Sequence, residues 1–399
     1  MKEEYENIIP VLSDTIRFNQ LADNEFILCN TQDKHYLRIN RKVYRVLCLV
    51  DGEKNLDEIA HLYESSYHEA LQITSIHRLL TDVMASYGMM KGYDDKIKLN
   101  TKPSYLKLSF IIFNQNLLSK IVHYFSPLFK KMVFIYLITT ILLCTTIILI
   151  NHIDLYKSFN VRAGFLLFIL LQFVSVTFHE IGHASAANYF GAEHGGIGGG
   201  FYLFKPVYYA DVTDIWKLKK SQRIVVNLAG MYFEFIFCFI VLLISSIFRN
   251  YTLTMTGLFI MICTLFNLNP FMRSDGYWVL SDLTNQPNLS SKSRKRVLKV
   301  LKQLFLREKI KWTYSDLYMI IYGCVKYAFL TLFLYYTLLK NPASVIYFPV
   351  NLYHFVKDMV IGNPISLYGF RKLIVPLIFY FLAYNFLKSF VKKLFNKTP

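Results

Sequence analysis

Residues 163–187 read AGFLLFILLQFVSVTFHEIGHASAA, and the interpretation of the whole chain starts from this stretch. An α-helix of about 20 mostly apolar residues crosses the hydrocarbon core of a bilayer, so the stretch predicts a membrane-spanning helix. It also carries His179, Glu180 and His183. Ionisable side chains inside a membrane span are costly unless they have partners, and they usually mark a functional site. We therefore expect a site on this helix.

Five further stretches have the length and composition of membrane spans. The chain has 399 residues, of which 54% are hydrophobic, more than a water-soluble protein of this size usually carries. The predicted fold class is an all-α polytopic membrane protein with about six transmembrane helices. Residues 340–371 could lie along the membrane interface. The predicted spans are residues 132–150, 163–187, 223–247, 252–268, 316–339 and 372–390.

The net charge of +17 comes mostly from Lys and Arg beside the apolar stretches. Ten of them lie between Arg273 and Lys311, whereas the loop after residue 247 holds only Arg249. Positively charged loops stay in the cytoplasm, so both termini are expected there, in a multi-pass protein of the cell membrane. The expected partner of this charge is the lipid bilayer, and no nucleic acid is expected.

Residues 293–306 alternate basic and apolar side chains at helical spacing. This pattern predicts either a helix lying on anionic lipid or a linker helix packed on the protein. The pattern alone does not favour one of the two.

The N-terminal region predicts a separate, small α+β domain. Residues 25–30 and 34–39 predict a β-hairpin, and helices are expected at about 41–50, 56–65 and 70–87. The predicted organisation is a cytoplasmic domain at 1–95, an amphipathic linker at 96–131 and a membrane domain at 132–395. The six cysteines show no metal-like spacing, and no disulfide is expected.

The spacing of His179 and His183 suggests a zinc site. Residues four apart lie on one face of a helix, so both imidazoles can reach one ion. Glu180 can then take a proton from the attacking water and deliver it to the leaving amine. HExxH arises by chance in soluble helices, but that explanation is weaker within an apolar span. The expected cofactor is Zn²⁺.

A catalytic zinc site needs a third protein ligand and an open position for water. The best candidate is Asp275, which follows the predicted span 252–268 at the end expected to share the depth of His183. Taken alone, Asp275-Gly276 would be read as an ordinary turn that leaves a helix.

Together, the two motifs resemble those of the site-2-protease clan of intramembrane metallopeptidases. Asn267, Pro270, Asp275 and Gly276 match the clan's NxxPxxxxDG segment. The resemblance implies that Asp275 is the third ligand and that Asn267 steadies the substrate backbone or the oxyanion, with Asn269 as the fallback.

More local segments resemble a subgroup, the peptide zinc metalloproteases of modified-peptide and bacteriocin pathways. These segments include Phe190-Gly-Ala, residues 210–216 and Pro287-Asn-Leu. Residues 10–59 resemble a PqqD-like domain, a winged helix that recognises leader peptides, although a generic winged helix with a structural role is also possible. The subgroup's Ala-Gly-Pro-x-x-Glu reads Ala-Gly-Met-Tyr-Phe-Glu at 229–234, which keeps Glu234. The resemblance implies a bacterial origin, and an exporter or a modifying enzyme as a possible partner.

Three further features have both functional and structural readings. Glu234 lies within a predicted span and either orients a ligating histidine or is a neutral structural acid, which is slightly favoured. Residues 191–200 hold six glycines, including Gly198 and Gly199, and predict a re-entrant hairpin whose edge could bind an extended substrate. His194 in this segment is expected to contact substrate, and a role as a metal ligand is not favoured.

The sequence therefore predicts a membrane zinc metallopeptidase with a site-2-protease-like core. Its expected substrate is a modified or leader-bearing peptide, or a peptide held in the membrane. One alternative is a catalytically silent membrane protein that binds a peptide for immunity or export, but an intact Glu180 argues against it. The other alternative is a metal or solute transporter, but the sequence shows no internal repeat that would support it.

Overall fold

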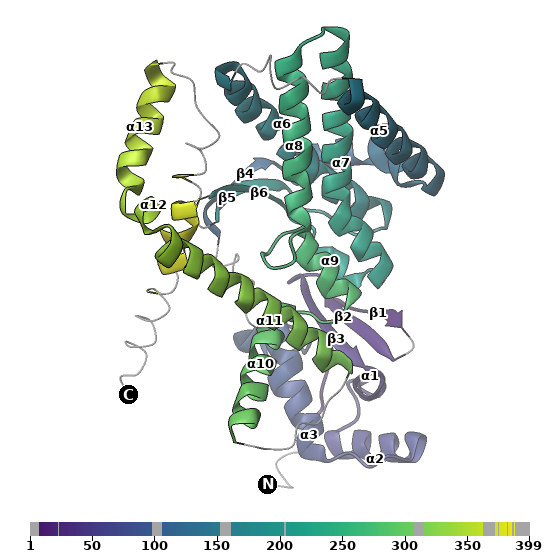
Figure 1. The fold of residues 1–399 in the computed structure, drawn as a ribbon. Coiled ribbons are helices and arrows are strands. Elements are labelled where there is room, and N and C mark those ends of the chain that lie inside the picture. Colours follow the sequence, from purple (N-terminus) through teal and green to yellow (C-terminus); the bar gives the residue numbers. More distant parts are fainter. Residues whose placement is uncertain are drawn as a thin grey trace. The chain divides into compact units, whose positions relative to one another are not determined.

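The computed structural model of the chain comprises two compact units (Figure 1). The first unit contains residues 1–130 and 180–229, and the second contains 131–179 and 230–399. One boundary between them falls inside a single unbroken helix, α6 (Val161–Tyr189). The structure describes residues 8–22, 24–97, 106–151, 161–202, 205–306, 314–361, 372–373, 375–380, 382–384 and 387.

The first unit begins with a three-stranded antiparallel sheet in the order β1-β2-β3. The predicted hairpin is confirmed as β2 (Glu25–Asn30) and β3 (His35–Asn40). Strand β1 (Ile16–Ala22) was not predicted, because its sequence IRFNQLA lacks the alternation of a half-buried strand. Its pairing with β2, with Phe18 opposite Leu28, makes it a strand.

Three helices pack on this sheet in the order in which the sequence predicts them. They are α1 (Arg41–Cys48), α2 (Leu56–Tyr67) and α3 (Ile73–Arg78), and α3 continues through a π turn and a 3-10 turn to Tyr87. Asn55 and Glu58 form a capping box at the start of α2, which satisfies backbone N–H groups there. The shared core includes the fully buried Leu28, Leu47, Ile59, Tyr63 and Met84.

A second antiparallel sheet, in the order β4-β5-β6, shows that the chain is not purely helical. Its strands are β4 (Leu106–Phe113), β5 (Ile197–Tyr202) and β6 (Lys205–Ala210). The glycine-rich residues predicted to form a re-entrant hairpin provide the first part of β5, which pairs with β6, and the re-entrant placement stays a prediction. Residues 96–131, expected to be an amphipathic linker, contain β4 and helix α4 (Gln115–Val122), and the expected domain division stays a prediction.

The glycines of β5 serve the sheet itself. A Cβ on Gly198 would lie 2.5 Å from the Tyr209 ring, and one on Gly199 would lie 2.8 Å from the Phe110 ring. Glycine at both positions therefore lets aromatic side chains of the neighbouring strands lie across β5. Since β4 and β6 occupy both sides of β5, an added strand would have to pair with β4 or β6. A direct role of Gly198 and Gly199 in substrate binding stays a prediction.

Among the described residues, five helices are long and apolar enough to cross a membrane. They coincide with the first five predicted spans and are Lys131–Ile150, Ala163–Tyr189, Lys220–Ile247, Tyr251–Leu268 and Asp316–Lys340. They belong to α5 (Lys131–Asn151), α6, α7 (Lys220–Ile247), α8 (Tyr251–Leu265) with the 3-10 turn that follows it, and α11 (Tyr314–Tyr335) with the π turn that follows it. Part of the predicted span 372–390 lies outside the described residues, and the described helix at 375–384 is shorter, so the sixth span stays a prediction.

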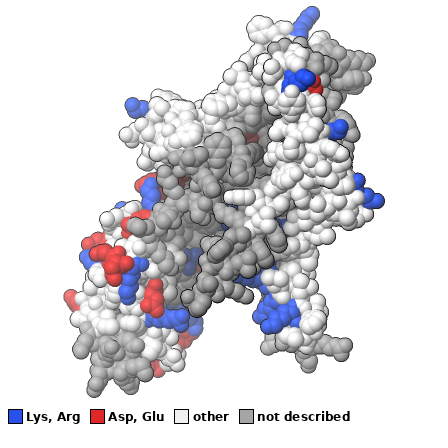
Figure 2. Space-filling view, turned by 90° about the vertical axis from the view of Figure 1, so that its left-hand side faces the viewer, with Lys and Arg blue, Asp and Glu red and all other residues white. Residues whose placement is uncertain are grey.

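The surfaces of these helices suit a lipid environment. Leu142, Leu166, Leu170, Phe329 and Leu332 are large apolar side chains that are more than half exposed. Exposed apolar area on this scale marks a surface that contacts lipid or another protein. Figure 2 shows clusters of Lys, Arg, Asp and Glu side chains, and also wide areas of surface drawn in white that carry no charged side chain. The chain thus has the features of a membrane protein.

The described part of the second unit also contains four further helices: α9 (Asp275–Leu283), α10 (Leu289–Phe305), α12 (Pro342–Ile346) and α13 (Phe348–Ile361). Helix α10 packs on the protein, as one of the two alternatives drawn from its sequence expects, and contact with anionic lipid stays a prediction. One face, with Val297 and Val300, is buried. The other exposes Leu298 and Phe305 among its basic residues. All six cysteines are free, as expected.

Candidate metal centre

Helix α6 carries three residues of the expected site within about one helical turn. His179, Glu180 and His183 are all at most 8% exposed, so their polar groups need partners within the protein. The helix continues without a break from the apolar residues of the predicted span to Tyr189. Helical geometry alone therefore places both imidazoles on one face.

Asp275 is the first residue of α9 and lies beside this face. Its Oδ2 is 3.0 Å from Nε2 of His179. Gly276 explains how the chain reaches this position, because a Cβ there would lie 2.1 Å from the carbonyl oxygen of Leu268. Only glycine allows the start of α9 to fold back so closely on the end of the preceding span.

His179, His183 and Asp275 form a group of potential metal ligands. One ligand atom from each lies within 4.8 Å of the others. Around a tetrahedral zinc ion, with metal–ligand distances of about 2 Å, ligand atoms lie about 3.3 Å apart, so small shifts would close the group on an ion. Two imidazoles and one carboxylate also suit a catalytic zinc ion, because they leave a fourth position for water. The residues present therefore fit Zn²⁺.

Each histidine is held through its Nδ1 atom. Nδ1 of His183 donates to the carbonyl oxygen of Val226, 2.7 Å away, and a carbonyl can only accept. Nδ1 of His179 lies 3.1 Å from Oε2 of Glu234, whose other oxygen accepts a hydrogen bond from Ser175. Protonation at Nδ1 places the lone pair on Nε2, which is the atom that a metal needs.

Glu234 is 2% exposed in the middle of α7. Its contact with His179 favours an orienting role over that of an isolated structural acid, which was the slightly favoured sequence interpretation. A carboxylate in this position fixes the ring orientation of a ligating histidine and raises its basicity. The role of Glu234 in metal binding stays a prediction, and the geometry supports it.

Glu180 points to the second sheet. Its Oε2 accepts the backbone N–H of Ala210, the last residue of β6, at 2.6 Å. This N–H therefore points away from β5, along the open side of β6. Ala184 of α6 and Ile197 of β5 are fully buried in one cluster that also includes Tyr208, and this packing holds the sheet against α6. Burial raises the pKa of Tyr208, so its phenol stays neutral.

The other predicted site residues lie in loops. Asn269 accepts the backbone N–H of Phe271 at 2.9 Å, so its side chain shapes the loop that leads to Asp275. Asn267 lies on the 3-10 turn Phe266–Leu268 and is half-buried. His194 is buried, with its Nδ1 atom 3.0 Å from the Gly195 carbonyl, and it does not belong to the three-residue ligand group. Roles of Asn267, Asn269 and His194 in catalysis or substrate binding stay predictions.

Sequence reasoning missed several supporting groups. The carbonyl of Val226 and the N–H of Ala210 are backbone groups. Nearly every residue has such groups, so the sequence does not identify these two. Ser175 was detectable in principle, because it precedes His179 by four residues and shares its helix face.

Glu234, which contacts Nδ1 of His179, provides a first prediction. Glu234→Gln should weaken zinc binding by about 10- to 100-fold, because the amide keeps the shape of the side chain and loses its charge. Titration of the purified protein against a zinc chelator measures this affinity. Ser175→Ala, which removes only the hydroxyl bound to Glu234, should have the smaller effect. Unchanged affinity in Glu234→Gln would make Glu234 a structural acid.

Comparison with known proteins agrees with a site of this kind. Over 142 residues the chain is 28% identical to a protein of Bacillus subtilis (strain 168) named "Putative peptide zinc metalloprotease protein YydH". The match covers 33% of this chain and 56% of that protein, little more than half of its length. No protein-family model and no solved structure matches the chain. The similarity supports a distant zinc-metalloprotease-like relation.

Proposed function

We propose that this chain is a membrane-embedded zinc metallopeptidase with a site-2-protease-like centre. One observation carries the proposal: ligand atoms of His179, His183 and Asp275 lie within 4.8 Å of one another, and both histidines belong to a helix apolar enough to cross a membrane. Glu180 follows His179 on the same helix, and we assign it the role of general base. The similarity to a protein named as a peptide zinc metalloprotease supports peptides as the substrate class.

The proposed mechanism needs metal ligands, a general base and a donor to the developing negative charge. His179, His183 and Asp275 would hold a zinc ion, which supplies Lewis-acid polarisation of the scissile carbonyl and of the attacking water. Glu180 takes the proton of that water and passes it to the leaving amine. Its hydrogen bond with Ala210 N–H orients the carboxylate for this transfer. Asn267 donates to the oxygen that gains negative charge, as its resemblance to the family motif implies.

The open side of β6 suits an extended substrate. Because the N–H of Ala210 points away from β5, the side of β6 that does not face β5 lies next to Glu180. A peptide that pairs there as an added strand lies extended beside Glu180. Proteases require this conformation, and strand addition supplies it through main-chain hydrogen bonds.

The N-terminal domain is proposed to bind a leader segment of the substrate. Tyr36 of β3 donates to Oδ1 of Asp214 at 2.7 Å, and Oδ2 of Asp214 accepts the N–H of Glu193 at 2.7 Å. Burial, followed by the bond to Asp214, raises the pKa of Tyr36 well above its usual range, which keeps the phenol a donor. This link ties the first sheet to the loops that follow α6 and β6, and so supports delivery of a peptide to β6.

Metal dependence tests the function. Removing zinc with a chelator should slow peptide cleavage by more than about 100-fold, because Lewis-acid stabilisation amounts to several kcal/mol, and added zinc should restore it. The test substrates are any short precursor peptides found encoded near the gene for this chain, each with and without its leader, and products are identified by mass spectrometry. Faster cleavage of the leader-bearing form would support leader binding. Binding of the peptide without any cleavage would favour the silent-binder alternative.

A further inference from the structure

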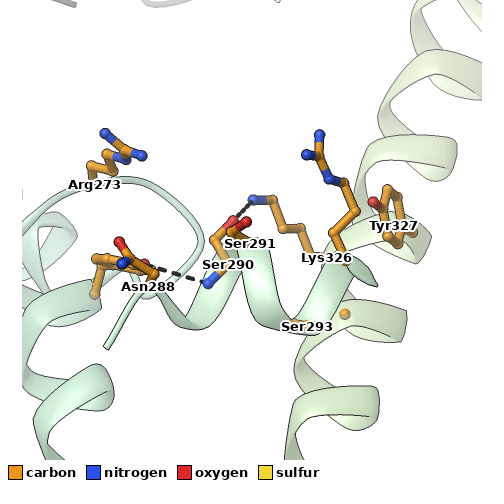
Figure 3. Close-up of a pocket in the computed structure, with 10 residues that line it drawn as sticks. Arg273, Asn288, Ser290, Ser291, Ser293, Lys326 and Tyr327 are labelled. Atoms are coloured by element: carbon orange, nitrogen blue, oxygen red, sulfur yellow. Dashed lines mark hydrogen bonds between the residues drawn. The ribbon is translucent and has the colours of Figure 1, made fainter. Parts of the chain in front are cut away.

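A cavity of about 410 Å³ lies in the second unit, between the start of α10, the loop before α9 and the middle of α11. Figure 3 shows Arg273, Ser290 and Lys326 around it. All of its lining residues belong to the second unit, and none is a residue of the candidate metal centre. It therefore needs an explanation of its own.

Among the described residues, three cationic side chains line this cavity and no acidic one does. Arg273, Arg294 and Lys326 are among its ten lining residues, none of which is Asp or Glu. Lys326 shares the cavity lining with both guanidinium groups, and like charges in one cavity repel one another. By contrast Arg296, also on α10, pairs with Asp316 at 2.7 Å. Positive charge concentrated without lining carboxylates points to an anionic ligand.

The position of Lys326 makes this concentration of positive charge energetically unfavourable unless an anion is bound. It lies in a candidate membrane span, where a charged side chain is unfavourable unless an opposite charge or water compensates it. Its Nζ atom donates to the hydroxyl of Ser290 at 2.8 Å, shown dashed in Figure 3, but a hydroxyl carries no charge. An anion in the cavity would compensate it.

The remaining lining groups suit the oxygens of a phosphate. Ser290 and Ser291 lie in the first turn of the 17-residue helix α10 and offer hydroxyl groups. The start of a helix adds partial positive charge to the same place. Guanidinium, ammonium and hydroxyl groups together form the set of donors that phosphate oxygens accept.

Close packing of two helices makes the cavity a formed site. A Cβ on Gly323 of α11 would lie 2.5 Å from the hydroxyl oxygen of Ser293 and 2.6 Å from Val297. Ser293 is 1% exposed and donates to the carbonyl of Met319. Glycine therefore lets α11 approach α10 closely, and this contact fixes the positions of Arg294 and Lys326 relative to each other.

We propose that this cavity binds a phosphate group, and that the headgroup of an anionic phospholipid supplies it. Helix α10 exposes Leu298, Leu301 and Phe305, each more than half exposed, on the same helix as Arg294. Such residues contact acyl chains when the phosphate of the same lipid lies among cations. Free phosphate has the same chemistry and is distinguished by experiment. The proposal does not depend on peptide hydrolysis.

Binding of defined probes to the full-length, detergent-purified protein tests the site. The probes are short-chain phosphatidylglycerol, short-chain phosphatidylcholine and inorganic phosphate, each titrated by calorimetry. The double variant Arg294→Gln/Lys326→Gln should bind phosphatidylglycerol about 100-fold more weakly, or about tenfold for each lost charge-assisted hydrogen bond. Lys295→Gln/Lys340→Gln removes the same charge from residues outside the cavity lining and should cost less than about fivefold.

The outcomes separate the sources of the phosphate. Preference for phosphatidylglycerol over both other probes supports the lipid headgroup. Tighter binding of inorganic phosphate, lost in the same double variant, keeps the phosphate site and replaces the lipid by free phosphate. Equal weakening in both double variants, or no binding of any probe, overturns the proposal. Arg294 is exposed, so Arg294→Gln alone repeats the test if the double variant does not fold.

Discussion

Replacing Glu180 with glutamine is expected to cut peptide turnover by about two to four orders of magnitude while zinc stays bound. Glutamine keeps the size of the side chain and an oxygen that can accept the N–H of Ala210, now 2.6 Å from Glu180 Oε2. It cannot take a proton from water. Since Glu180 is not among the three expected ligands, the metal content should not change.

Cleavage rates by mass spectrometry and zinc content by atomic absorption check this expectation. Glu193→Gln is the matched control, because it removes an exposed carboxylate from the loop after the same helix. The control should cleave at the wild-type rate. Wild-type cleavage by Glu180→Gln would mean that Glu180 is not the base, and the chain would then be better described as a silent peptide binder.

Alanine at any of the three ligand positions is expected to remove most of the zinc. His179→Ala, His183→Ala and Asp275→Ala should each weaken zinc binding by more than about 100-fold, beyond the range for outer partners such as Glu234. About one zinc per chain is expected in the wild type. Because Asp275 Oδ2 lies 3.0 Å from His179 Nε2, its loss also removes the carboxylate beside this nitrogen, while Glu234 stays beside Nδ1.

His194→Ala is the control for this series. His194 is another buried histidine, on the loop after α6, and it lies outside the ligand group. The variant should keep its zinc and should have a circular dichroism spectrum like that of the wild type. Full zinc retention in Asp275→Ala would remove Asp275 from the ligand set, and zinc loss in His194→Ala would add a ligand that the structure does not place there.

Much of the helical architecture was predictable from the sequence because the information is local. A run of about 20 apolar residues forms a helix in lipid whatever its neighbours are, since every backbone hydrogen bond must be made within the segment. The five described spans therefore coincide with predicted ones. The spacing of His179 and His183 likewise defines one helix face without any knowledge of the tertiary structure.

Pairings between distant segments were not predictable in this way. Phe110 of β4 pairs with Gly199 of β5, and no local pattern in residues 106–113 indicates which strand pairs with β4. Strand β1 exists because β2 offers it hydrogen bonds. The sequence suggested that Gly198 and Gly199 lie on an open strand edge. In the structure β5 is the central strand between β4 and β6, and the strand next to Glu180 is β6.

The sequence by itself determined which helices are apolar enough to span a membrane, and which histidines share a face, because hydropathy and helical periodicity depend only on neighbouring residues. Only the tertiary structure decided the partners of the charged groups. It placed Glu234 against His179 and brought Lys326 of α11 to Ser290 of α10. Such contacts depend on how helices far apart in the chain pack, and a residue's type does not encode the side chain that will lie opposite it.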